Sequence, residues 1–333
     1  MIAKSRSTTF FILLIAGCWL LINLTGCYPT YPKGKLKESI VKICKKEYKL
    51  DVKVDTLGKT IAIYLPLSED LLDFNFGLTK SAGEKIDDVI TSATRVVLST
   101  DADFDFYCVI VHDARIPEVQ FVIIKYVYDV KRALLNDISR GEYGRRILFD
   151  LKLNPQAQKE RAVKEVFEKM GIENKWQSEV MNDFFRSEPT ALGDIGYWNG
   201  RFFIKDITLP EFLAEQIANR MKIEFREDKD ISASYMIKSS KGSYQTKEGK
   251  RFFRLEVQAE PKIFTDIERK ELPDVVFRTA LTIINKVLYG YKYEDFDYFE
   301  ILDIPSSRVL KVSKSDLESL RKNKISFEDL VKK

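Results

Sequence analysis

The segment LKESIVKICKKEYKLDV, which begins at Leu36, has a counterpart in LPEFLAEQIANRMKIEF, which begins at Leu209. Ungapped alignment pairs apolar residues first at the spacing of one helix face and then at the spacing of one strand face. The pairs are Leu36 with Leu209, Ile40 with Leu213, Cys44 with Ile217, Tyr48 with Met221, Leu50 with Ile223, and Val52 with Phe225. Because the period changes at the same place in both segments, we predict a helix followed by a strand in each, and an internal duplication.

Further matches follow in the same order along the chain. KTIAIYLPL from Lys59 aligns with RFFRLEVQA from Arg251, and DFDFY from Asp103 aligns with DFDYF from Asp295, all with strand patterns. Helical patterns that begin at Ile86 and at Pro273 lie between these matches, and a second strand follows each Asp-rich match. Each copy closes with a helix, in which Asp129, Val130, Ala133, Asn136, Ile138 and Ser139 correspond to Asp316, Leu317, Leu320, Asn323, Ile325 and Ser326.

Each copy therefore has the predicted order helix–strand–strand–helix–strand–strand–helix. Short strand connections favour hairpins, so we predict an α+β fold of two tandem copies, with mostly antiparallel sheets and helices on one face. The copies occupy residues 36–152 and 206–333, and a helical and loop connector at 153–205 joins them. The second copy carries extra residues within 226–250, which we expect to extend a hairpin.

The connector contains its own structural signals. Asn154 before Pro155 predicts the start of a helix that ends at Gly171, and a second short helix is predicted over 173–185. Asn199-Gly200 between apolar residues predicts a tight hairpin, because this turn needs two positive φ angles. Tyr197 and Trp198 beside this turn are the best candidates for an exposed aromatic patch that binds a partner.

Composition and charge exclude several function classes. The chain has 333 residues, with 54 basic and 50 acidic side chains and a net charge of +4. This small charge lacks the basic field of a nucleic-acid binder, so we predict no nucleic-acid partner. The 45% of hydrophobic residues is typical of a globular protein rather than a disordered one. We predict no cofactor, because the sequence has no phosphate-binding glycine loop, no CxxC pair and no HExxH motif.

The N-terminus has the features of an export signal. Lys4 and Arg6 precede an apolar run from Phe10 to Leu24, which ends in Leu24-Thr25-Gly26-Cys27. The run is shorter than the roughly 20 residues of a membrane span. The tetrapeptide resembles the lipobox of bacterial lipoprotein signal peptides. The resemblance implies that the Cys27 thiol is acylated and that residues 1–26 are removed, so that Cys27 becomes the first residue.

Two alternatives exist at this end of the chain. Ile15-Ala16-Gly17-Cys18 is a second box-like tetrapeptide, although cleavage there would leave an apolar stretch exposed on the mature protein. An uncleaved signal anchor is the other alternative. With Cys27 lipidated, residues 27–35 form the anchor and a short extended tether, because two prolines and a glycine follow the cysteine. The lipoprotein resemblance also implies the periplasmic face of the outer membrane, since Tyr28 stands where aspartate favours inner-membrane retention.

Three groups of side chains are candidates for chemistry. Asp101, Asp103 and Asp105 alternate, so their carboxylates could share one strand face and bind a metal, although a solvated strand entry explains them as well. His112, next to Asp113, could be half of a general-base pair, although a surface histidine at a strand end is the simpler interpretation. Cys44 and Cys108 could form a disulfide after export, although Cys44 occupies a predicted core position and Cys108 a partly exposed one.

These features favour a lipid-anchored cell-envelope protein that is not an enzyme. Its expected partners are the membrane, through Cys27, and other envelope proteins, for which it would act as a scaffold or assembly factor. The alternative is a periplasmic carrier or sensor of an apolar ligand. A third candidate is an envelope hydrolase that uses the Asp103 region. A closed apolar cavity of several hundred Å³ between helices and sheet would favour the carrier. A filled core with an exposed aromatic patch would favour a partner-binding protein, and clustered buried carboxylates in a cleft would favour an enzyme.

Overall fold

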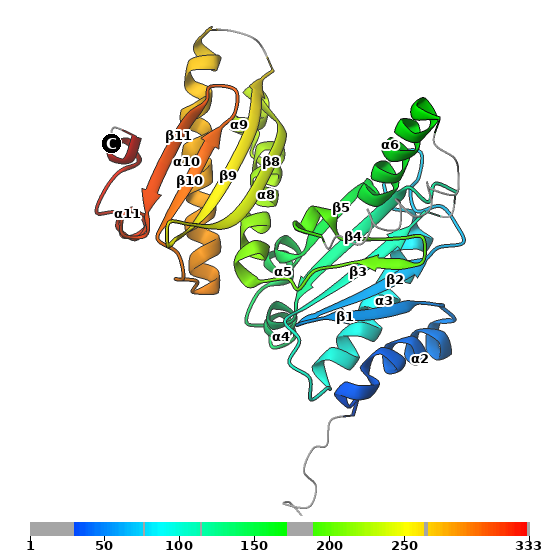
Figure 1. The fold of residues 1–333 in the computed structure, drawn as a ribbon. Coiled ribbons are helices and arrows are strands. Elements are labelled where there is room, and N and C mark those ends of the chain that lie inside the picture. The colour runs from blue at the N-terminus through cyan, green and yellow to red at the C-terminus, as the bar shows by residue number, and fades with distance from the viewer. Residues whose placement is uncertain (1–29, 76, 114, 172–188, 263–265, 332–333) are drawn as a thin grey trace, which may run out of the picture.

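The structure is a computed structural model that describes residues 30–75, 77–113, 115–171, 189–262 and 266–331. These residues form two lobes that lie side by side, each built on a sheet (Figure 1). Within these ranges, no helix is both long enough and apolar enough to cross a membrane. The predicted signal peptide with Cys18 and Cys27, and the predicted helix at 173–185, lie outside the described residues.

The first lobe contains a five-stranded sheet in the order β1-β2-β3-β4-β5. The β2–β3 pair is parallel, and the other three pairs are antiparallel. The elements are η1 (Lys33–Lys35), α2 (Leu36–Tyr48), β1 (Lys53–Leu57), β2 (Thr60–Pro66), α3 (Lys80–Leu98), β3 (Phe106–His112), β4 (Val119–Tyr126), α4 (Val127–Leu134), α5 (Arg140–Arg146) and β5 (Leu148–Leu153).

The second lobe contains a four-stranded sheet in the order β11-β10-β9-β8. Here β9 and β10 are parallel, and the other two pairs are antiparallel. The elements are α8 (Leu209–Glu227), α9 (Lys229–Ser234), β8 (Tyr235–Lys247), β9 (Lys250–Pro261), α10 (Asp266–Tyr291), β10 (Tyr298–Asp303), β11 (Arg308–Ser313), α11 (Lys314–Arg321) and α12 (Phe327–Val331).

The α+β class, the mostly antiparallel sheets and the repeated order of elements are confirmed. In both lobes the second strand pairs in parallel with the third, and the register is the same. Thr60 lies opposite Phe106 in the first lobe, and Phe252 lies opposite Tyr298 in the second. These four residues occupy matching positions in the aligned segments, so the duplication extends to the pairing of the strands.

The closing helices repeat as closely as the sheets. Helices α4 and α11 each contain 8 residues. Each is followed by an asparagine in the left-handed region, Asn136 with φ 57° and Asn323 with φ 53°. Asparagine tolerates this conformation better than most residues. The first lobe then adds β5, an edge strand with no counterpart in the second lobe among the described residues.

The helix that opens the second lobe is longer than predicted. Ile223 and Phe225, which we expected on a strand face, belong to α8, and β8 begins only after α9. The reason is that Met221 and Phe225 continue the helical spacing of four, and no glycine or proline stops the helix. In the first lobe, Lys49 takes a left-handed conformation with φ 61° and ends α2 earlier.

The connector contributes α6 (Pro155–Met170), η2 (Leu192–Asp194), β6 (Gly196–Trp198) and β7 (Arg201–Phe203). The Asn154 side chain accepts hydrogen bonds from the first turn of α6, and Gly171 ends the helix, as predicted. The predicted Asn199-Gly200 turn joins β6 to β7, with φ angles of 45° and 83°.

The two lobes differ in the second face of their sheets. In the first lobe, α2 and α3 cover one face, and the connector together with the start of α8 covers the other. In the second lobe, α8 and α10 cover one face, while the other carries charged side chains such as Arg254, Glu256 and Glu300, which form ion pairs. Only the second lobe therefore has helices on one face and solvent on the other, as we predicted for both.

Candidate functional site

Edge strand β5 exposes a row of large apolar side chains. Phe149, Leu151 and Leu153 alternate along the strand, so they share the sheet face that α2 and α3 cover over the inner strands. Their exposed fractions are 54%, 41% and 53%, whereas Phe121 and Ile123, their partners on β4, are buried. The two helices therefore leave the last strand uncovered. We call Phe149, Leu151 and Leu153 the β5 strip.

The outer edge of β5 faces the second lobe across a cleft. Among the described strands, none pairs with this edge or with the outer edge of β8. A cavity of about 270 Å³, open to solvent, lies between the two edges. Its lining comes from β4, β5, η2, α8 and β8, so both lobes and the connector contribute to it.

The walls of this cavity differ in character. The first lobe and η2 provide an apolar wall, which includes Val122, Ile124, Leu148 and Leu192. Most of the cationic side chains come from α8 and β8, and the lysines of the lining are Lys152, Lys222, Lys238 and Lys241. Only two carboxylates, Asp150 and Glu215, accompany them in the lining. The cleft is thus apolar on one side and positively charged on the other.

Burial perturbs the groups at the floor of the cleft. It raises the pKa of Glu215 to about 7 and lowers the pKa of Lys152. The Lys152 ammonium donates to the carbonyl of Gly193 at 2.7 Å and lies 3.5 Å from Asp150. Ser240 on β8 is only 3% exposed, and its hydroxyl oxygen has no hydrogen-bond partner among the described residues. A buried hydroxyl without a partner is uncommon and needs an explanation.

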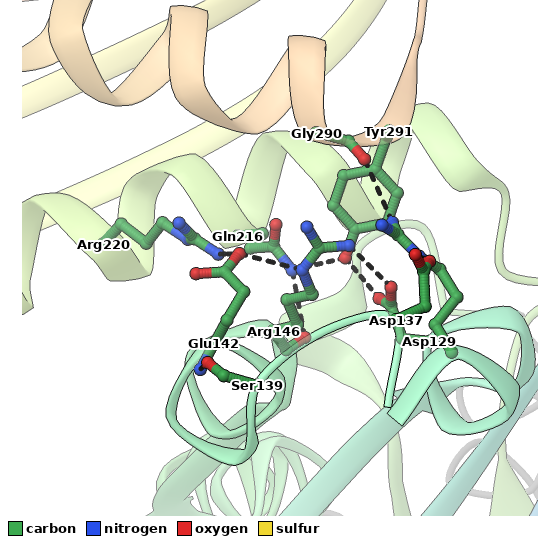
Figure 2. A network of polar contacts seen from close by, with 10 residues as sticks. Asp129, Asp137, Ser139, Glu142, Arg146, Gln216, Arg220, Gly290 and Tyr291 are labelled. Carbon is green, nitrogen blue, oxygen red and sulfur yellow. Dashed lines mark hydrogen bonds and ion pairs between the residues drawn. The ribbon is translucent and has the colours of Figure 1, made fainter. Parts of the chain in front are cut away.

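A buried polar network joins the lobes on an adjoining face of α8 (Figure 2). Arg146 of α5 donates to Asp129 of α4 at 2.8 Å and to Glu142 at 2.9 Å. The Arg146 guanidinium lies over the ring of Tyr291 in α10, 4.5 Å from its centre. The hydroxyl of Tyr291 donates to the second carboxylate oxygen of Asp129.

Helix α8 completes the network. Arg220 donates to Glu142 at 2.9 Å, and Gln216 donates to the carbonyl of Arg146 at 3.0 Å. Burial opposes ionisation of Glu142, but hydrogen bonds from Arg220 and Arg146 outweigh it, so the pKa of Glu142 lies below its usual value. Because α4 and α5 belong to the first lobe, and α8 and α10 to the second, the network holds the walls of the cleft at a set separation.

The three candidate aspartates are engaged with cations or backbone. Lys59 lies 2.7 Å from Asp103 and 3.3 Å from Asp105, and Asp101 accepts the amide of Lys33 at 2.6 Å. The second lobe repeats the first of these pairs between Arg251 and Asp295. The repetition supports an architectural role at the strand entry. Within the described ranges, no three His, Cys, Asp or Glu side chains are grouped to hold a metal ion.

The predicted surface position of His112 is wrong. The side chain is 7% exposed, and burial lowers its pKa, although a hydrogen bond that the ring donates to the Gln120 amide oxygen opposes this. The ring lies 3.3 Å from the Gln120 amide oxygen and packs edge-on against Tyr64. The neighbouring Asp113 instead accepts backbone amides, including that of Leu71 at 2.8 Å. The two side chains serve separate structural contacts, so the structure does not bring them together as a general-base pair.

The predicted exposed patch at Tyr197 and Trp198 is also corrected. Tyr197 is 5% exposed and stacks on Tyr64, with 3.7 Å between the ring centres. Trp198 is half-buried, and its indole donates to Glu160 at 2.5 Å. The β6–β7 hairpin turns both residues toward the connector face of the first sheet, and the exposed apolar surface lies on β5 instead.

Cys44 and Cys108 are both free and buried. Cys44 packs in the core between α2, α3 and the sheet, whereas Cys108 packs on the connector side of the same sheet. The expectation that Cys108 is partly exposed is wrong. It rested on the matching residue Glu300, which lies on the uncovered face of the second sheet. In the first lobe the connector covers the corresponding face, so Cys108 is buried. The sheet separates the two thiols, which prevents a disulfide in this fold.

The β5 strip and the cleft were not among the residues predicted from the sequence. The pattern LFDLKL from Leu148 alternates like a strand and could have indicated β5. No comparable signal existed for the cleft lysines, because three separate elements supply them. No known protein family, curated protein or solved structure matches this chain.

Proposed function

We propose that this chain is a lipid-anchored cell-envelope protein, without catalytic activity of its own, that binds another envelope protein through the β5 strip. The observation that carries the proposal is the exposure of Phe149, Leu151 and Leu153 on one edge strand, at 54%, 41% and 53%. Soluble proteins usually protect an edge strand with charge, proline or a covering element. A contiguous exposed apolar strip therefore favours a partner that covers it.

The anchor is part of the same proposal. A lipidated Cys27 would hold the body at the membrane surface through the tether at 27–35, on the periplasmic face of the outer membrane. Substituting Cys27→Ser should abolish labelling of the protein by a fatty-acid probe in growing cells. Continued labelling of that variant would place the lipid elsewhere, for example on Cys18.

A photoreactive amino acid placed at Leu151 in the full chain tests the partner. We expect one cross-linked adduct of defined mass in intact cells, and we expect the additional change Leu153→Lys to reduce it strongly. Val309 on β11 is a matched control, because it is 54% exposed on an edge strand of the other lobe. The same adducts from both positions, or none from Leu151, would contradict binding through the β5 strip.

A further inference from the structure

The cleft between the lobes has the features of a ligand site. It adjoins the β5 strip, because Phe149 also lines the cavity, whereas Leu151 and Leu153 do not. Its cavity of about 270 Å³ is close to the lower limit, roughly 300 Å³, of typical small-molecule sites. That size suits a single slender chain better than a bulky ligand. The buried network on the adjoining face of α8 holds the walls in place, so the site exists before any ligand arrives.

The apolar wall offers a surface for a hydrocarbon chain. Val122, Ile124, Leu148 and Leu192 are all less than one-tenth exposed. The first three lie on the face of the first sheet that the connector covers elsewhere, and Leu192 belongs to η2 of the connector. At this place η2 is the part of the connector that lines the cavity, through Leu192 and Gly193. A hydrocarbon chain in the cavity would extend this core and would be removed from water.

The opposite wall offers charge. Lys222 and Lys241 form no ion pair with any described residue, and both act electrostatically on Glu215 together with Lys152. Lys152, Lys222 and Lys241 therefore all lie near Glu215 in the cavity lining. The unpartnered hydroxyl of Ser240 lines the same cavity and could bind an oxygen of a ligand. Lys238 pairs with Glu260 at 3.4 Å and Lys152 lies 3.5 Å from Asp150, which leaves Lys222 and Lys241 for a ligand of one or two negative charges.

From this arrangement we propose that the cleft binds an amphiphile with one acyl chain and an anionic head group. The chain lies against Leu148 and Leu192, and the head group lies among Lys222, Lys241 and Ser240. The head-group chemistry is shared by fatty acids, which are carboxylates, and by single-chain phosphates. The cleft would then carry or sense such a lipid, whether or not a protein binds to the β5 strip.

Photolabelling of the full-length protein in lipid nanodiscs tests the proposal. The probe is dodecanoate with a diazirine in its chain, and the labelled residues are mapped by mass spectrometry. We expect adducts on β4, β5 and residues 192–193, with competition by dodecanoate or by dodecyl phosphate but not by dodecanol. Which of the two anions competes better identifies the head group. Equal competition by dodecanol would overturn the proposal, because the lysine wall would then contribute nothing.

Variants locate the site. Gly193 lines the cavity, and a Cβ there meets no atom within 4 Å, so Gly193→Trp should fill the cleft without strain and abolish labelling. Gly144→Trp is the control, because Gly144 is equally open but lies on α5. The double variant Lys222→Glu and Lys241→Glu should lower labelling roughly tenfold or more, as expected for lost charge-assisted hydrogen bonds. Lys229→Glu on α9 should leave it unchanged.

Ser240→Ala separates binding from folding. Removing a buried hydroxyl that lacks a partner should leave the midpoint of urea unfolding unchanged or slightly higher. The same change should lower probe labelling several-fold, because the head group loses a hydrogen bond. Labelling that survives both Gly193→Trp and Ser240→Ala would show that the lipid binds outside the cleft.

Discussion

The Arg146 guanidinium lies 2.8 Å from the Asp129 carboxylate, and the two side chains are only 6% and 2% exposed. Asp316 occupies the matching position of the second lobe, but there its carboxylate accepts a hydrogen bond from Ser313 at the start of α11. One position of the repeat therefore caps a helix in one lobe and joins the two lobes in the other.

This difference predicts unequal effects of the same substitution. Asp129→Asn removes one of the two carboxylates that Arg146 contacts, while Glu142 remains, so we expect the free energy of unfolding to fall by about 1.5–3 kcal/mol, as for a lost hydrogen bond between charged groups. Asp316→Asn changes hydrogen bonds with Ser313 in the first turn of α11, where a helix cap is worth about 1 kcal/mol. Urea unfolding of the purified variants measures both values. Equal losses would mean that the ion pair adds nothing beyond a local cap.

The two cysteines give a second prediction. Because the first sheet separates Cys44 from Cys108, both should react with a thiol reagent in denaturant without prior reduction. In the native protein the reaction should be slow, since burial raises the pKa of Cys44 and raises that of Cys108 to about 12. Mass spectrometry of the alkylated protein counts the modified thiols. Labelling that requires a reductant would reveal a disulfide and a different arrangement of the first lobe.

Lys125 on β4 gives a third prediction, which rests on the duplication. It is 8% exposed, and burial lowers its pKa to about 8, although Asp87 opposes this. Its counterpart in the aligned strand of the second lobe is Val312, which is fully buried. A lysine whose folded pKa lies below its unfolded value destabilises the fold fully below the folded pKa, and the penalty disappears as pH rises toward the unfolded value.

Lys125→Val should therefore stabilise the protein by about 2 kcal/mol at pH 7. The gain should shrink between pH 8 and 10.5, the folded and unfolded pKa values of the lysine. Unfolding midpoints of the variant and the parent across this range test the expectation. A destabilised variant would show that the ammonium's contact with the Tyr143 ring outweighs the cost of burial.

The repeat was predictable from the sequence because apolar residues match between the two copies, first at the spacing of a helix face and then at the spacing of a strand face. Matching positions such as Asp129 and Asp316, or Asn136 and Asn323, carry the same residue in both copies. The parallel pairing of β2 with β3 was not predictable in the same way, since strand patterns do not indicate which neighbour a strand chooses. That pairing depends on α3, which carries the chain back across the sheet.

The position of the connector was harder still to predict. The first-lobe strands YCVIVH and FVIIKY are apolar on both faces, whereas the second-lobe strands alternate with charge. This difference indicates a covered second face. It does not show that β6, β7 and η2 cover that face, or that the cover stops at β4 and leaves a cleft. Those features depend on how two lobes pack, which sequence periodicity does not record.

Glu215 on the cleft floor gives the last prediction. Burial raises its pKa from 4.5 to about 7; Asp150 raises it further, and Lys222, Lys152 and Lys241 oppose the shift. A carboxyl group whose folded pKa is raised favours the fold in its protonated form. The penalty for ionising it begins above pH 4.5, the unfolded value, and is complete above pH 7.

Glu215→Gln keeps the shape of the protonated acid, so we expect it to stabilise the protein by about 2 kcal/mol at pH 8 and by almost nothing at pH 4. Glu224→Gln, on an exposed position of the same helix, should change stability by less than about 0.5 kcal/mol at either pH. If Glu215→Gln is no more stable than the parent at pH 8, the carboxylate must be paired with the cleft lysines, and the positive charge left for an anionic head group would be correspondingly smaller.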